Sequence, residues 1–227
     1  MAYESITRGF IPGFVGEFGN SLFRNMYNHL HENSSTSAEG RNLNIALAYD
    51  YMAKVLSNSH QQQEYQHFIK EYFEKTLRNH HFKVSIELLH QFQNQEMISY
   101  VISASPHCYV GNAYHIVPIP KENLFGINGT YNENYWSVDS SIHFAQGKVL
   151  RLQKIIQDLE QKTQKKVIVL SGFGNSWKSD GPFISYIMKE YGGLGVMINP
   201  GSVPQDLDPQ IKHQEMMQIS LINNYLF

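Results

Sequence analysis

The chain has 227 residues, of which 42% are hydrophobic, and its formal net charge is −2. A chain of this length can bury one good core, or one core with a smaller appended domain. Because there is no basic excess, the charge gives no support for binding to nucleic acid. No apolar segment approaches the ~20 residues that span a bilayer, so no membrane partner is expected.

The chain contains a single cysteine, Cys108. One cysteine rules out an intramolecular disulfide framework and fits a reducing compartment. The N-terminus has no basic region followed by an apolar one, which a secretory signal would require. A cytoplasmic location is therefore the expectation.

The first third of the chain predicts helices and loops, with no convincing strand. Apolar residues recur at helical spacing in residues 21–31, 42–56 and 61–78. We therefore expect residues 1–82 to form a helical, cap-like region and residues 83–227 to form an α/β core.

The pattern changes after residue 82. Residues 84–93 have the spacing of a helix, and residues 97–102 form a continuous apolar run that is typical of a buried strand. The small residues of 103–106 then predict a loop at the end of this strand.

Residues 114–120 and 123–137 contain alternating apolar and polar patches. Asn128 and Gly129 form the dipeptide most typical of a tight hairpin turn, so this region predicts a hairpin. The pattern of residues 211–227 does not indicate whether they form a helix, a strand or a loop.

Residues 147–200 predict a βαβ unit in a parallel sheet. A helix is expected at 147–162, a strand at 167–170, a glycine-rich loop at 171–176, a helix at 182–190 and a strand at 195–198. Ligands in such folds bind at the carboxyl ends of the strands. The loop after the strand at 167–170 is therefore the first place to expect chemistry.

Three polar signals fall at or near strand ends in this α/β part. Ser103 closes the strand at 97–102, Lys148 opens a helix, and a loop carries Asn175 and Asp180. A hydroxyl and a lysine ammonium can bind phosphate oxygens. An amide oxygen and a carboxylate are the hard ligands that Mg²⁺ prefers. Together they indicate a phosphate and Mg²⁺ site.

These signals, in this order, resemble the haloacid dehalogenase (HAD) superfamily of phosphohydrolases, especially its phosphoserine-phosphatase-like branch. VISASP at 101–106 resembles the second motif of that family, a strand that ends in Ser or Thr. Lys148, after Gly147, resembles the lysine of the third motif. The order and spacing match over residues 84–200.

The fourth motif of the family is an acidic loop, and SGFGNSWKSDGPF at 171–183 resembles it in a variant form. Asn175 stands in the first acidic place and Asp180 in the second. The resemblance implies a HAD-like Rossmannoid core, a three-layer α/β/α arrangement with a parallel sheet, and an N-terminal helical cap.

The resemblance also implies an activity, the hydrolysis of a small phosphomonoester through an aspartyl-phosphate intermediate with Mg²⁺ as cofactor. Ser103 would bind the phosphoryl group, and Lys148 would hold it together with the charge of the nucleophile. Asn175 and Asp180 would hold the metal, although Asn175 gives the site less negative charge than an aspartate would.

The first motif of the family, a strand that ends in D-x-D and supplies the nucleophile, is not found in this sequence. Residues 206–208 have the D-x-D spacing but follow a proline, and we interpret them as a loop or a helix start. The expectation is a truncated or inactive phosphohydrolase, and the alternative is a non-catalytic binding or regulatory protein that keeps the fold. Residues 3–10 or 217–225 are the candidates to fill the place of the missing strand.

Other motifs fit less well. A cysteine-phosphatase loop at Cys108 would need an arginine where Tyr114 stands. A dinucleotide loop would need a glycine at Trp177, and a nucleophile elbow would need one at Lys178. The histidine pairs match no zinc spacing. Structural interpretations stay open for two site residues, since Ser103 could cap the next helix and Lys148 could be solvated.

Overall fold

The structure is a computed structural model, and it describes residues 67, 70–77, 82–127, 129–132, 135–138, 143–212 and 216–220. The chain divides into two compact units. The N-terminal unit comprises Met1–Val101, Ser105–Ser140 and Phe227, and the C-terminal unit comprises Ile102–Ala104 and Ser141–Leu226. The helices expected at 21–31 and 42–56 lie outside the described residues, and the boundary expected near residue 82 stays a prediction. The described part is mixed α/β, as the pattern indicates.

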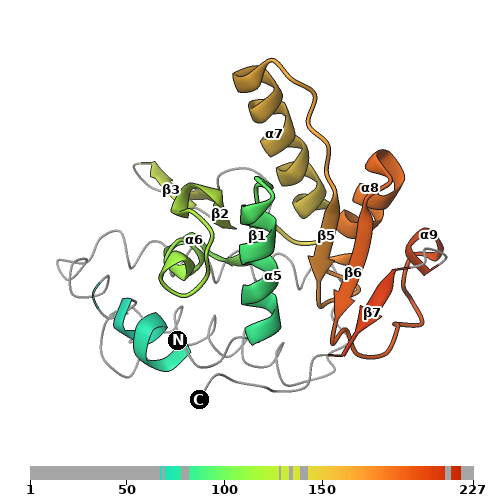
Figure 1. Cartoon of the computed structure of the whole chain (residues 1–227), viewed down its shortest axis with the longest axis horizontal. Coiled ribbons are helices and arrows are strands. Elements are labelled where there is room, and N and C mark those ends of the chain that lie inside the picture. Colours follow the sequence, from blue (N-terminus) through green and yellow to red (C-terminus); the bar gives the residue numbers. More distant parts are fainter. Residues whose placement is uncertain are drawn as a thin grey trace. The chain divides into compact units, whose positions relative to one another are not determined.

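The C-terminal unit contains a three-stranded parallel sheet in the order β5-β6-β7 (Figure 1). Its strands are β5 (Ser171–Gly174), β6 (Leu194–Ile198) and β7 (Met217–Ile219). Helix α7 (Gln146–Thr163) precedes β5, and α8 (Gly181–Tyr191) connects β5 to β6. The predicted βαβ unit is therefore confirmed, and α7, α8 and β6 each lie within one residue of their expected bounds.

Strand β5 begins later than the apolar run predicts. Of the run 167–170, only the Leu170 carbonyl bonds to β6, accepting from Leu194 N at 2.8 Å, and residue pairing starts where Ser171 lies opposite Leu194. Gly192, in the left-handed conformation with φ of 64°, ends α8 two residues before β6 begins. Because β6 begins at Leu194, no residue of β6 lies opposite the residues before Ser171. The glycine-rich loop expected at 171–176 is therefore largely strand β5 itself.

The glycines of this sheet allow α8 to pack closely against it. A Cβ added at Gly172 would lie 2.7 Å from Ile187 Cδ1, and one added at Gly195 would lie 2.4 Å from Met188 Sδ. Both distances are shorter than real Cβ contacts, so a larger residue at either position would displace the α8 side chain that packs against it. Glycine therefore serves helix–strand packing here.

Two apolar clusters stabilise the C-terminal unit. The first joins α8, β6 and the segment that ends in α9 (Pro209–Lys212), and its buried members are Trp177, Ile184, Met197, Leu207, Ile211 and Met216. The second joins α7 to α8, with buried members Leu152, Ile156 and Ile187. Ile102 of β1 (Val101–Pro106) packs against the second cluster, which places the middle of β1 in this unit.

In the N-terminal unit, helix α5 (Lys83–Asn94) confirms the helix predicted at 84–93. A π-helix, η2 (Tyr72–Leu77), lies within the helix predicted at 61–78. Strand β1 is hydrogen-bonded to β2 (Leu124–Ile127) and begins at Val101, four residues later than expected. Just before it, the Ser99 carbonyl accepts a bond from the Asn123 side chain at 3.2 Å, so a side chain takes the place of a strand partner there.

The hairpin forms at a different place from the one predicted. Strands β3 (Gly129–Asn132) and β4 (Tyr135–Val138) pair antiparallel, with Asn132 opposite Tyr135. The predicted turn is therefore wrong, because Gly129 lies within β3. The alternating patch at 114–120 forms no strand, and three short helices lie in or beside it: α6 (His107–Val110), η3 (Ala113–His115) and η4 (Lys121–Asn123).

Residues 217–219, for which the sequence predicts no structure, form β7 on the side of β6 that is opposite to β5. They cannot fill a place beside β5, because β6 lies between the two strands, so this part of the expectation for 217–225 is wrong. The other candidate segment, 3–10, lies outside the described residues. No helix in the described part of the chain has the length and apolar character needed to cross a membrane.

Candidate functional site

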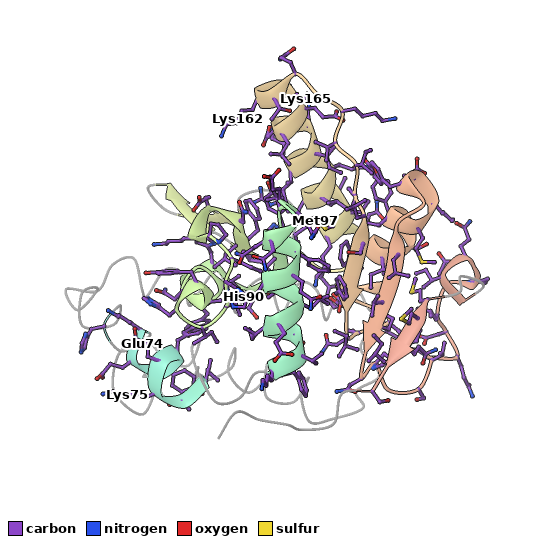
Figure 2. All side chains as sticks on the ribbon, in the orientation of Figure 1. Glu74, Lys75, His90, Met97, Lys162 and Lys165 are labelled. Atoms are coloured by element: carbon purple, nitrogen blue, oxygen red, sulfur yellow. The ribbon has the colours of Figure 1, made fainter. Side chains whose placement is uncertain are left out.

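Lys148 is the third residue of α7, and it is buried. Only 8% of its surface is exposed, although the usual place for a lysine side chain is the solvent. Lys162, in the last turn of the same helix, and Lys165, just beyond its end, are exposed (Figure 2). The interpretation of Lys148 as a solvated residue is therefore wrong.

Asp180 is the partner of Lys148. Its Oδ1 lies 2.5 Å from Lys148 Nζ, and the two side chains are only 7% and 10% exposed. Its Oδ2 accepts hydrogen bonds from the backbone amides of Asn175 at 2.9 Å and Ser176 at 3.0 Å. Each carboxylate oxygen therefore has a donor, as a buried charge requires.

The loop between β5 and α8 is closed by Asp180 itself. Asp180 is the N-cap residue of α8, but its side chain bonds to the preceding loop and not to the helix. Ser176 Oγ accepts a bond from Ser179 N at 3.3 Å. A Cβ added at Gly174 would lie 2.4 Å from Asp180 Cβ, so only glycine allows the loop to fold this closely around the carboxylate.

A histidine that belongs to no sequence motif lies shortly before α7, the helix that carries Lys148. His143 is 1% exposed, and its Nδ1 lies 3.2 Å from the carbonyl oxygen of Ser103. Its Nε2 accepts a bond from Arg151 Nε at 3.0 Å. Sequence reasoning missed His143 and no local pattern marks it, because its partners lie 40 residues before it and 8 residues after it.

The predicted site residues can now be placed. Lys148 and Asp180, 32 residues apart, are in direct contact. Ser103 lies within β1 and not at its end, and its carbonyl is connected to the start of α7 through His143. Because α6 begins at His107, Ser103 does not cap it. Asn175 contacts Asp180 through its backbone amide, and its side chain is exposed.

As placed, these residues do not fit Mg²⁺. Both Asp180 oxygens already accept bonds from donors, and the ammonium group of Lys148 lies 2.5 Å from one of them, where it would repel a cation. Within the described ranges, no three side chains of His, Cys, Asp or Glu are close enough to hold a metal ion. In this arrangement the buried ammonium favours an anion over a cation.

The rival motifs have structural roles in the same region. Trp177 is buried in the α8 cluster, and its Nε1 donates to the Gly201 carbonyl at 3.3 Å. In the D-x-D segment, Leu207 is buried, and Asp208 Oδ1 accepts a bond from Gln210 N at the start of α9. This segment is therefore a helix start, as the sequence predicts.

Comparison of the chain with protein-family models, with curated proteins and with solved structures gave no match, so its geometry is the basis for any assignment.

Proposed function

We propose that this chain is a phosphohydrolase-like α/β protein of the HAD type, in which Lys148 and the strand-end loop bind the phosphoryl group of a small phosphomonoester. The chain carries no D-x-D at a strand end, so the proposal ends at binding and includes no phosphoryl-transfer step. It keeps the HAD-like three-layer core and the N-terminal helical cap as parts of the same hypothesis.

The observation that carries the proposal is the contact between Lys148 Nζ and Asp180 Oδ1 at 2.5 Å. Motif order alone assigns these two residues to one site, although they are 32 residues apart. A buried ion pair must offset the desolvation of both charges and is often no more stabilising than apolar residues, so stability alone is a weak reason for it. Their contact therefore supports a common site at the carboxyl end of β5.

The position of Lys148 in its helix also supports an anion site. The amino end of a helix carries a partial positive charge, which disfavours a lysine in the first turn. Burial disfavours the ammonium further. Asp180 offsets part of this positive potential, and a phosphate at the same place would offset the rest. A positive residue kept at an unfavourable place is the feature that a phosphate site needs.

A second candidate, a non-catalytic binding or regulatory protein with the same fold, is favoured by the state of Asp180. Both of its oxygens are engaged by Lys148 and by the loop amides, so it is not available as a base or a nucleophile. In this second candidate the loop binds an anionic ligand, and no turnover follows.

The test is the binding of inorganic phosphate to the full chain by isothermal titration calorimetry. We expect Lys148→Met to abolish binding. The double variant Lys148→Met with Asp180→Asn should also fail to bind while it stays folded, because it leaves no unpaired buried charge and the new side-chain amide oxygen can still accept from the loop amides. Lys154→Met is the matched control, because Lys154 lies on the same helix with an exposed partner, Asp158, at 2.8 Å.

Phosphate binding that is equal in all four proteins, or that is absent from the unmodified chain, would contradict the proposal. Turnover tests the non-catalytic candidate. We expect no hydrolysis of p-nitrophenyl phosphate in the presence of Mg²⁺. Hydrolysis that is lost in Asp180→Ala would show that a nucleophile exists elsewhere in the chain and would exclude the non-catalytic candidate.

A further inference from the structure

His143 is the most deeply buried of the polar side chains near Lys148, at 1% exposure. It belongs to neither the predicted site nor an apolar cluster. A buried imidazole is unfavourable unless both of its nitrogens have partners. Here both are engaged, by the carbonyl of Ser103 and by the guanidinium of Arg151.

The partners of His143 determine where its ring proton lies. A guanidinium can only donate, so the Nε2 that faces Arg151 Nε must be the acceptor. Nδ1 therefore carries the proton and donates it to the carbonyl oxygen of Ser103. The two contacts together therefore define one tautomer of the ring.

His143 belongs to a short turn that makes three separate connections. His143 bonds to Ser103, Ala145 N donates to Ser179 O at 3.1 Å, and Lys148 contacts the neighbouring Asp180. Ala145 has φ of 47° and ψ of −117°, a conformation that is unfavourable for any residue except glycine. Such strain persists only where the surroundings impose it, and it is concentrated at functional sites.

We infer that His143 is a positioning residue, which holds Ser103 in place relative to Lys148 by donating Nδ1–H to the Ser103 carbonyl. The inference rests on the proposed phosphate site, with Ser103 taken as the phosphate-binding residue that the family resemblance implies, because it assigns His143 a role in assembling that site. Ser103 and its neighbours 102–104 belong to the same unit as α7, so the connection is internal to that unit. His143 itself contacts no phosphate. It acts through the backbone of β1.

Two conservative variants of the full chain separate the two bonds of His143. In His143→Asn, the side-chain amide can occupy the place of Nδ1 and still donate to Ser103, but the acceptor for Arg151 is lost. In His143→Gln, the side-chain oxygen can occupy the place of Nε2 and accept from Arg151, but the donor to Ser103 is lost. His90→Gln, at an exposed histidine of α5, is the control (Figure 2).

We expect His143→Gln to weaken the binding of inorganic phosphate by about tenfold, which is the lower end of the effect of losing an outer-shell partner in metal sites. His143→Asn should bind within about threefold of the unmodified chain on the same reasoning. Each variant loses one hydrogen bond. If the role of His143 were purely structural, the affinity for phosphate would fall in each variant in proportion to the fall in its melting temperature. Equal losses of affinity in the two variants, or no loss in either, would overturn the inference.

Nuclear magnetic resonance distinguishes failure of this inference from failure of the proposed function. Long-range ¹H–¹⁵N correlations should show the proton of His143 on Nδ1, and a proton on Nε2 would overturn the inference. If phosphate does not bind to the unmodified chain, the proposed function fails. The inference about position is then decided by the backbone amides of Ser103 and Ala104. The inference is supported if the chemical shifts of these amides differ from those of the unmodified chain in His143→Gln but match them in His143→Asn. It is excluded if the chemical shifts are the same in the unmodified chain and in both variants.

Discussion

Two lysine–aspartate pairs each include one residue of the loop between β5 and α8, Asp180 in the first and Lys178 in the second. The contact between Lys148 and Asp180 measures 2.5 Å, and the contact between Lys178 and Asp206 measures 2.7 Å. The chemical groups are identical, but the side chains of the first pair are 10% and 7% exposed, and those of the second are 47% and 72% exposed. Burial is therefore the main difference between them.

This difference separates a pair that needs an explanation from one that does not. An exposed pair is solvated and screened, and it contributes about 0–1 kcal/mol. A buried pair must offset the desolvation of both ions, and replacing such a pair with apolar residues is often neutral or stabilising. Because burial makes the Lys148–Asp180 pair an inefficient way to stabilise the fold, a ligand-binding role explains its presence better.

The largest effect is expected from breaking the buried pair on one side only. Lys148→Met leaves the Asp180 carboxylate buried without its cation, so the free energy of unfolding should fall by about 3–5 kcal/mol. Urea denaturation followed by circular dichroism measures this loss. The double variant Lys148→Met with Asp180→Asn should recover most of the stability, because no uncompensated charge remains. If Lys148→Met lowered the free energy of unfolding by less than about 1 kcal/mol, the buried pair would contribute no more than an exposed pair does.

The next largest effect tests how tightly the loop surrounds Asp180. In Gly174→Ala the new Cβ would lie 2.4 Å from Asp180 Cβ, so the carboxylate must move away from the amides of Asn175 and Ser176. We expect a loss of about 1–3 kcal/mol, as for other overpacked sites. The comparison variant is Gly201→Ala, which has open space around its Cβ but φ of 68°. It should lose only about 1 kcal/mol. Equal losses would show that the loop is loose.

The elements that were predictable are those that local pattern specifies. The apolar periodicity of α5, α7 and α8 is present in consecutive residues, and so is the βαβ order. The meeting of Lys148 with Asp180 was predictable because Lys148 opens a helix and Asp180 follows a strand, and in a βαβ unit helix starts and strand ends share one edge of the sheet.

The rest depends on partners that local pattern does not name. Strands β1 and β5 begin where a neighbouring strand can pair with them and not where their apolar runs begin. The hairpin closes between Asn132 and Tyr135, although Asn128 and Gly129 offered the better turn dipeptide. His143 was missed because its function depends on a carbonyl 40 residues away.

A smaller effect of opposite sign tests the turn that carries Lys148. Ala145 holds φ of 47° and ψ of −117°, so Ala145→Gly should relieve strain, and this gain should exceed the added entropy of the unfolded chain. We expect a gain of about 1 kcal/mol, which raises the melting temperature of a chain of this size by about 2–4 °C in differential scanning calorimetry. Ala113→Gly, in the short helix η3, is the control and should not stabilise. A loss of stability in Ala145→Gly would mean that the turn is unstrained.

The smallest effect is expected at the exposed pair, and it tests the other side of the comparison. Lys178→Met removes a cation that water and salt already screen, so the free energy of unfolding should fall by no more than about 1 kcal/mol. At about 1 M NaCl the Debye length is about 3 Å, and the difference from the unmodified chain should then disappear. The Lys148→Met difference should persist at the same salt concentration, because buried charges are screened much less. If salt instead removed both differences equally, burial would not distinguish the two pairs, and the argument that Lys148 is held in the core for a ligand would lose its physical basis.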